Sequence, residues 1–147
     1  MTIAVDFDGT IVEHEYPKIG AERPFAIETL KMLIKDRHKL ILWSVREGRL
    51  LEEAVNWCRE RGVEFYAVNK DYPEEKREGN NHYSRKLNSI DIFIDDRNIG
   101  GLPDWGTIYH MISAKKTWND IVEEEHHSSR LSSYEDVHPK KKPWWKF

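Results

Sequence analysis

The hydrophobic positions of the chain form short continuous runs and longer amphipathic stretches. Five short apolar runs, typical of buried strands, occur at residues 2–7, 39–44, 63–68, 90–94 and 107–112. Between the first three runs, apolar residues recur at three- and four-residue spacing, which predicts two amphipathic helices. The first covers residues 26–34 after Pro24, and the second covers residues 50–58 and ends near Gly62.

This order of elements predicts the fold class. Apolar strands that alternate with helices form a parallel sheet covered on both faces. We therefore expect an α/β fold, a Rossmann-like three-layer sandwich with a central five-stranded parallel sheet. Residues 1–125 would make up this domain, with a short last helix at residues 118–125. Residues 126–147 would be a polar C-terminal tail that combines lysines with aromatic residues.

Composition narrows the class of protein. The chain has 147 residues, of which 39% are hydrophobic and 33% charged, as expected for one globular domain. A net charge of −3 excludes general attraction to nucleic acid or to anionic membranes. Cys58 is the single cysteine, so an intrachain disulfide and a thiolate zinc cluster are both excluded. No apolar run approaches the roughly 18 residues of a membrane span, and the N-terminus lacks the pattern of a signal peptide. We expect a cytoplasmic protein.

Oxygen-bearing side chains lie at or just after the carboxyl ends of three of the predicted strands. They are Asp6, Asp8, Ser44, Asp95 and Asp96. Because the carboxyl ends of parallel strands meet at one edge of a sheet, where ligands bind, we expect these side chains to lie close together. Carboxylates suit Mg²⁺, whose open coordination positions can accept a phosphoryl oxygen. Gly9 would allow the backbone to turn tightly beside this site.

These residues resemble the motifs of a known family. The sequence DFDGT at residues 6–10, directly after an apolar strand, resembles the first motif of haloacid dehalogenase-like (HAD) phosphohydrolases. Ser44 resembles the second motif, and the pair Asp95-Asp96 resembles the fourth. The third motif requires a lysine, for which Lys86 and Lys70 are both available. Lys86 fits better, because the lysine of small capless members comes shortly before the acidic strand. The resemblance covers about residues 1–113.

The resemblance implies a mechanism of phosphate ester hydrolysis. Asp6 would be the nucleophile that forms an aspartyl-phosphate intermediate, and Asp8 would protonate the leaving oxygen and then activate water. Mg²⁺ would be held by the Asp6 carboxylate, the Asp8 main-chain carbonyl and Asp96. The other predicted site residues would bind the phosphate, namely Ser44, Lys86, Arg46 and Gly9, or support the site, namely Thr10 and Asp95. Thr10 would brace the Asp8 loop, and Asp95 would orient Lys86 or a metal-bound water.

Arg46 lies two residues after Ser44, where its guanidinium fork could hold a second phosphate or a carboxylate. The sequence leaves open whether Arg46 contacts substrate, caps a helix, or pairs with Glu47 or Glu52.

The substrate is less defined than the chemistry. The connections after the first and third strands are too short for a cap domain, so we expect an open active site. Such a site would take a macromolecular phosphate, a nucleic-acid end included, or a small phosphate ester that a second subunit of a homo-oligomer covers. The chain's own candidate covers are a flap with His14, Tyr16 and Lys18 and a charged loop. The residues of interest in that loop are Tyr72, Lys76, Arg77, His82, Tyr83 and Arg85.

Two other interpretations compete with the phosphatase. A receiver-type signalling domain would carry an aspartate at the end of the third strand, where this chain has Asn69. The alternative that stays open is a catalytically silent, HAD-like metal-binding adaptor. Its function would reside in the basic and aromatic residues 140–147, which would bind a partner or a nucleic acid.

Overall fold

The computed structural model describes residues 1–76 and 87–137, and the side chains of residues 132–137 are not described. Lys86 and part of the charged loop, Arg77, His82, Tyr83 and Arg85, lie outside the described residues, as do residues 140–147. The chain divides into two compact units, Met1–Tyr109 and His110–Phe147. Each unit is described separately below.

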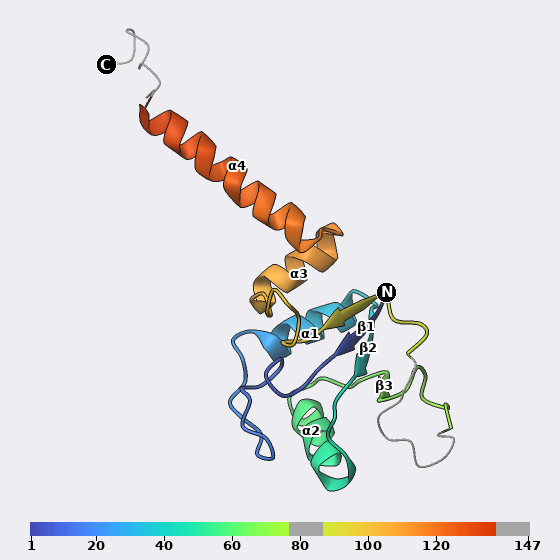
Figure 1. The fold of residues 1–147 in the computed structure, drawn as a ribbon. Coiled ribbons are helices and arrows are strands. Elements are labelled where there is room, and N and C mark those ends of the chain that lie inside the picture. The colour runs from blue at the N-terminus through green and yellow to red at the C-terminus, as the bar shows by residue number, and fades with distance from the viewer. Residues whose placement is uncertain (77–86, 138–147) are drawn as a thin grey trace. The chain divides into compact units, whose positions relative to one another are not determined.

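The described part of the first unit contains a four-stranded parallel sheet with helices beside it (Figure 1). The strands are β1 (Thr2–Val5), β2 (Lys39–Leu42), β3 (Ala67–Val68) and β4 (Ile92–Ile94), and their spatial order is β3-β2-β1-β4. The helices are α1 (Ala26–Lys35), α2 (Gly48–Glu60) and the first part of α3 (Trp105–Ala114). The predicted α/β class with a parallel sheet is therefore confirmed.

The four strands end in register, which places the residues after them at one edge. Val5 pairs with Leu42 on one side and with Ile94 on the other, and Leu42 pairs with Val68. All these pairings are parallel. The segments that begin at residues 6, 43, 69 and 95 therefore leave the sheet together.

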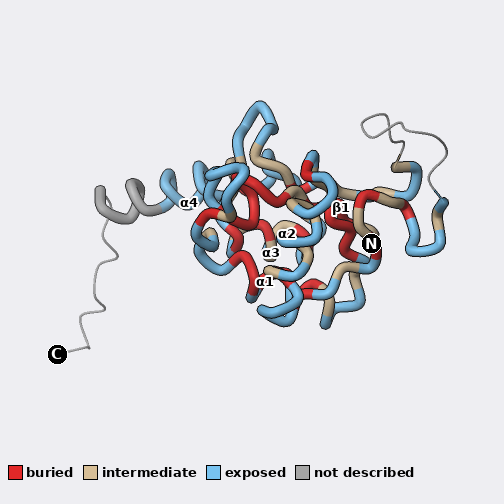
Figure 2. The backbone as a smooth tube through the Cα atoms, turned by 90° about the horizontal axis from the view of Figure 1, so that it is seen from below, coloured by how far each residue is buried: buried red, intermediate tan, exposed pale blue. Residues whose placement is uncertain are grey.

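The two predicted amphipathic helices, α1 and α2, each bury one face. The buried residues of α1 are Ala26, Ile27, Thr29, Leu30 and Leu33, and those of α2 are Ala54 and Cys58. Figure 2 shows the buried residues of β1 in red. Each fully buried leucine or isoleucine stabilises the fold by roughly 1.5–3 kcal/mol. The predicted end of α2 is also confirmed, because the Gly62 and Val63 amides donate to the carbonyls of Arg59 and Cys58 in a Schellman motif.

The prediction of a fifth strand at residues 107–112 is wrong, because this segment belongs to α3. The β-branched and aromatic residues of this segment are typical of a strand. However, Asp104, which directly precedes α3, caps the first turn of a helix. The Asp104 carboxylate accepts from the Thr107 amide at 3.0 Å and from the Thr107 hydroxyl at 2.6 Å. These bonds lower the pKa of Asp104. The cap satisfies a backbone donor of the first turn, and this local signal decides for the helix.

The second unit contains the end of α3 and the helix α4 (Trp118–Val137). Thr117 and Asp120 form a capping box, since the Thr117 amide donates to Asp120 at 2.7 Å and the Asp120 amide donates to the Thr117 hydroxyl at 3.4 Å. The helix runs past Glu125, where the sequence predicted its end, since residues 118–137 contain no glycine or proline. It thus includes the first part of the expected tail. Among the described residues, none of the helices has both the length and the apolar character that crossing a bilayer requires.

Candidate functional site

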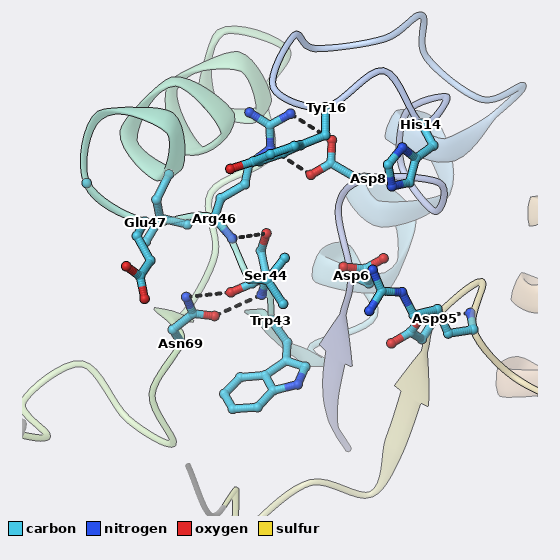
Figure 3. Close-up of a pocket in the computed structure, with 14 residues that line it drawn as sticks. Asp6, Asp8, His14, Tyr16, Trp43, Ser44, Arg46, Glu47, Asn69 and Asp95 are labelled. Atoms are coloured by element: carbon cyan, nitrogen blue, oxygen red, sulfur yellow. Dashed lines mark hydrogen bonds and ion pairs between the residues drawn. The ribbon is translucent and has the colours of Figure 1, made fainter. Parts of the chain in front are cut away.

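Three carboxylates lie together where β1 and β4 end. One oxygen from each of Asp6, Asp95 and Asp96 lies within 4.8 Å of the other two. Figure 3 shows Asp6 and Asp95 beside each other at the ends of these adjacent strands. Oxygen ligands of this kind suit a hard divalent cation such as Mg²⁺.

Asp6 has a strongly perturbed carboxyl group. Burial raises its pKa from 3.8 to about 7, and the negative charges of Asp95 and Asp96 add to this rise. Hydrogen bonds from the Phe7 backbone and the Thr10 side chain oppose it in part. The cluster is therefore electrostatically unfavourable when all three groups are ionised and nothing positive is bound.

Thr10 and Gly9 hold Asp96 beside Asp6. The buried Thr10 hydroxyl accepts from the Asp96 amide at 3.0 Å and lies within donating distance of Asp6 Oδ2 at 3.1 Å and Asp96 Oδ1 at 3.4 Å. Thr10, which the sequence suggested as a brace of the Asp8 loop, connects Asp6 with Asp96 through its hydroxyl. Gly9 has φ +84°, and a Cβ there would lie 2.4 Å from Asp96 Oδ2. Only glycine fits this contact without displacing Asp96.

Asp8 forms a buried ion pair with Arg46. Arg46 Nε donates to Asp8 Oδ2 at 2.7 Å, and Nη2 donates to Asp8 Oδ1 at 2.7 Å. The Arg46 side chain is 0% exposed and that of Asp8 is 9% exposed. Hydrogen bonding to Asp8 raises the pKa of Arg46. The sequence left open whether Arg46 pairs with a carboxylate and named Glu47 and Glu52 as candidates. The structure shows that Arg46 does bind a carboxylate, and that this carboxylate is Asp8.

Asn69, at the end of β3, fixes the backbone of Ser44 at the end of β2. The Ser44 amide donates to Asn69 Oδ1 at 2.8 Å, and Asn69 Nδ2 donates to the Ser44 carbonyl at 2.9 Å (Figure 3). The Ser44 hydroxyl accepts from the Arg46 amide at 3.1 Å. Asn69 is buried and has φ +51°, a conformation that asparagine tolerates better than most residues.

A cavity of about 380 Å³ joins these groups. The predicted site residues that line it are Asp6, Asp8, Ser44, Arg46 and Asp95. Two residues of the flap, His14 and Tyr16, also line it, together with Trp43, Val45, Glu47, Gly48, Leu51, Asn69 and Arg97. Thus the edge of the sheet brings Asp6, Asp8, Asp95 and Ser44 to one cavity, whereas Asp96, Gly9 and Thr10 lie outside its lining. Lys70, the alternative lysine, is half-buried after β3, whereas Lys86 lies outside the described residues.

Sequence reasoning did not select Asn69 or Arg97 for the site. For both residues, their position directly after a strand end could have indicated a place in the site. Asn69 directly follows Val68 at the same carboxyl edge, and Arg97 directly follows the acidic pair at the end of β4. The arrangement supplies three clustered carboxylates for a cation, of which Asp6 and Asp95 line the cavity. The same cavity is lined by Asp8, a buried carboxylate with a cationic partner, and by Ser44.

Comparison with known proteins gives one informative result. The chain matches no protein-family model and no curated protein. It is similar to a solved structure, that of the conserved protein coded by a locus of Bacteroides thetaiotaomicron, with a TM-score of 0.74 and 68% sequence identity. The match covers 82% of this chain and 96% of that chain. At this identity and coverage, the chain belongs to the same family as the conserved Bacteroides thetaiotaomicron protein.

Proposed function

We propose that the protein is a Mg²⁺-dependent phosphomonoester hydrolase of the HAD type, with Asp6 as its nucleophile. The observation that carries the proposal is that Asp6, Asp8, Ser44 and Asp95 line one cavity at the carboxyl edge of the parallel sheet. A carboxylate oxygen of Asp96 lies within 4.8 Å of those of Asp6 and Asp95. A Rossmann-like three-layer arrangement without a cap domain belongs to the same proposal.

The proposed reaction has two displacements at phosphorus. A carboxylate oxygen of Asp6 attacks phosphorus, the bond to the leaving oxygen breaks, and Asp8 supplies the proton that this oxygen takes up. Asp8 then accepts a proton from a water molecule, which attacks phosphorus and releases the Asp6 carboxylate and inorganic phosphate. Over one cycle Asp8 gives one proton to the leaving oxygen and regains one from water, and the phosphoryl group passes from the substrate to Asp6 and then to water. In this structure both Asp8 oxygens accept from Arg46, so Asp8 is a carboxylate. The proposed cycle therefore requires Asp8 to take up a proton and release one of these bonds before it protonates the leaving oxygen.

The donor set fits Mg²⁺. Asp6 and Asp96 would hold the ion together with the main-chain carbonyl of Asp8, and Asp95 is the third carboxylate within reach. When bound, Mg²⁺ supplies positive charge that offsets the mutual repulsion of these groups and of the incoming phosphate. Burial is the largest cause of the raised pKa of Asp6, and the charges of Asp95 and Asp96 add to it. A bound cation would offset the part that comes from these charges.

The phosphate-binding residues of the proposal are Ser44, the turn at Gly9, and Lys86. Asn69 keeps the Ser44 backbone in place, which leaves the hydroxyl beside the cavity. Arg46 supports the site differently from a phosphate ligand. Four of its five N–H donors are used in bonds to Asp8, Pro17 and Lys18, so we assign it a positioning role.

Turnover of p-nitrophenyl phosphate tests the proposal. The wild-type protein should hydrolyse it with Mg²⁺ and lose this activity with EDTA, and Asp6→Asn should lower kcat by about a thousandfold or more. Asp91→Asn is the matched control, because Asp91 is exposed, lies outside the lining of the cavity and, among the described contacts, its carboxylate accepts one bond, from the Thr2 amide. Hydrolysis that survives Asp6→Asn would refute the mechanism. Mg²⁺ binding without hydrolysis of any phosphomonoester is the result that the adaptor alternative predicts.

A further inference from the structure

The flap, defined here as residues 13–21, has a fixed stem. The Glu13 amide donates to the Ala21 carbonyl at 2.8 Å, and Val12 and Glu22 form an antiparallel bridge next to this bond. A Cβ at Gly20 would lie 2.2 Å from the Glu13 carbonyl oxygen, so the two sides of the stem are in closest contact. The stem therefore leaves the flap little freedom to swing as a whole.

The tip of the flap is tied to the floor of the cavity by Arg46. Its Nη1 donates to the Pro17 carbonyl at 3.1 Å, and its Nη2 donates to the Lys18 carbonyl at 2.8 Å. The same guanidinium holds Asp8 in two bonds of 2.7 Å and lies 5.2 Å from the Tyr16 ring centroid. One buried side chain thus joins the flap to Asp8, as Figure 3 shows from the position of Tyr16 over Arg46. We call this arrangement the Arg46 clasp.

The clasped flap forms part of the cavity wall. His14 and Tyr16 line the cavity opposite residues that follow β2 and β4, among them Ser44 and Asp95. The cavity volume of about 380 Å³ is near the lower end of the range for small-molecule sites. A phosphoryl group at Asp6 leaves room for a group of the size of a sugar or a nucleoside, whereas a polymer would require the flap to move away.

We infer that the site acts on small phosphomonoesters, and that the Arg46 clasp sets this size limit by holding the flap over the cavity. This inference rests on the proposed phosphatase activity and departs from the open site that the short connections suggest. Arg46 acts as a positioning residue, because its contacts are with Asp8 and the flap. Arg46 donates to backbone carbonyls of the flap, and a side-chain substitution in the flap does not remove these acceptors. Arg46 is therefore the residue to substitute in order to release the clasp.

The test compares one phosphate group on leaving groups of different size. The probes are p-nitrophenyl phosphate, a 5′-mononucleotide, a single-stranded oligonucleotide with the same nucleotide at its phosphorylated 5′ end, and a phosphoserine peptide. For the wild type, kcat/KM should be about 100-fold lower or more for both polymers than for the mononucleotide. Equal kcat/KM for the mononucleotide and a polymer would overturn the inference. Absence of all hydrolysis, p-nitrophenyl phosphate included, would instead count against the proposed function.

Two variants separate the clasp from general stability. In Arg46→Lys the single ammonium cannot hold Asp8 and both carbonyls, and in a second variant two glycines replace residues 15–18. Both should raise the polymer-to-mononucleotide ratio of kcat/KM by about tenfold or more, whereas a merely destabilised enzyme loses activity on all probes alike. Arg49→Lys is the matched control, because Arg49 is an exposed residue of α2 whose ion pair is with Glu53. An unchanged ratio in both clasp variants would overturn the inference.

Limited proteolysis tests the clasp without any turnover. Trypsin should cleave after Lys18 slowly in the wild type, although this side chain is exposed, because the Lys18 carbonyl is held by Arg46. Arg46→Lys should accelerate this cleavage about tenfold or more, and Arg49→Lys should leave it unchanged. Cleavage after Lys18 that is equally fast in the wild type and in Arg46→Lys would contradict a clasped flap.

Discussion

Replacing Asp6 by asparagine should make the metal-free protein more stable, and increasingly so as the pH rises. In the folded protein the pKa of Asp6 is raised from 3.8 to about 7, chiefly by burial and further by Asp95 and Asp96. An acid whose pKa is higher in the folded than in the unfolded chain favours folding fully at pH values below the unfolded pKa. That contribution is lost as the pH rises toward the folded pKa. Asp6→Asn removes the ionisation and keeps the size of the side chain.

The size of the effect follows from the shift of about three pKa units. Each unit corresponds to about 1.4 kcal/mol, which sets an upper bound of about 4 kcal/mol above pH 7. Asp6 is only half-buried, so solvent screening reduces this value. Between pH 5 and pH 8 we therefore expect the wild type to lose roughly 1–2 kcal/mol of unfolding free energy relative to Asp6→Asn.

Urea unfolding in EDTA at several pH values measures this difference. Asp104→Asn is a suitable control, because hydrogen bonds with Thr107 lower the pKa of Asp104. Asp104 is therefore ionised in both the folded and the unfolded chain above pH 5, and its variant should differ from the wild type by the same amount at every pH tested. Parallel curves for wild type and Asp6→Asn would refute the reasoning from burial and charge.

Three further variants test the arrangement of the site. Gly9→Ala should lower the unfolding free energy by about 2–4 kcal/mol in urea, because the residue has a positive φ and its Cβ would meet Asp96; a loss within error would contradict the close contact. Asp96→Ala should weaken Mg²⁺ binding in calorimetry about tenfold more than Asp95→Ala, since Thr10 holds Asp96 in place, and the reverse order would exchange their roles. Asn69→Ala should cost about 1–3 kcal/mol in the same urea experiment because the Ser44 amide and carbonyl both lose a partner; an unchanged midpoint would show that water replaces these bonds.

Much of the sheet and of its acidic edge could be predicted from the sequence. Continuous apolar runs separated by amphipathic helices specify parallel strands, and parallel strands bring the residues after Val5 and Ile94 to one edge. Gly62 was predictable as the end of α2 for a local reason, since a left-handed residue after a helix is most often glycine.

The structure of residues 107–112, the partner of Arg46 and the role of Asn69 could not be predicted from the hydrophobic pattern. A β-branched and aromatic run is ambiguous between strand and buried helix, and at residues 107–112 the cap from Asp104 decided for the helix. Arg46 has several acidic residues near it in sequence, but its partner Asp8 lies in the segment that follows β1. Only the three-dimensional structure brings the two together in a buried pair. Asn69 was overlooked because its role is to hold the Ser44 backbone, which no spacing rule reports.

The account depends most directly on covalent chemistry at Asp6. In Asp8→Asn, the second displacement lacks its base, whereas p-nitrophenolate is a leaving group that needs little protonation in the first. Acid-quenched Asp8→Asn treated with Mg²⁺ and p-nitrophenyl phosphate should therefore carry one phosphoryl group, which peptide mass spectrometry should locate on Asp6. A phosphoryl group on another residue, or wild-type turnover with no adduct on Asp6 in this variant, would contradict Asp6 as the nucleophile.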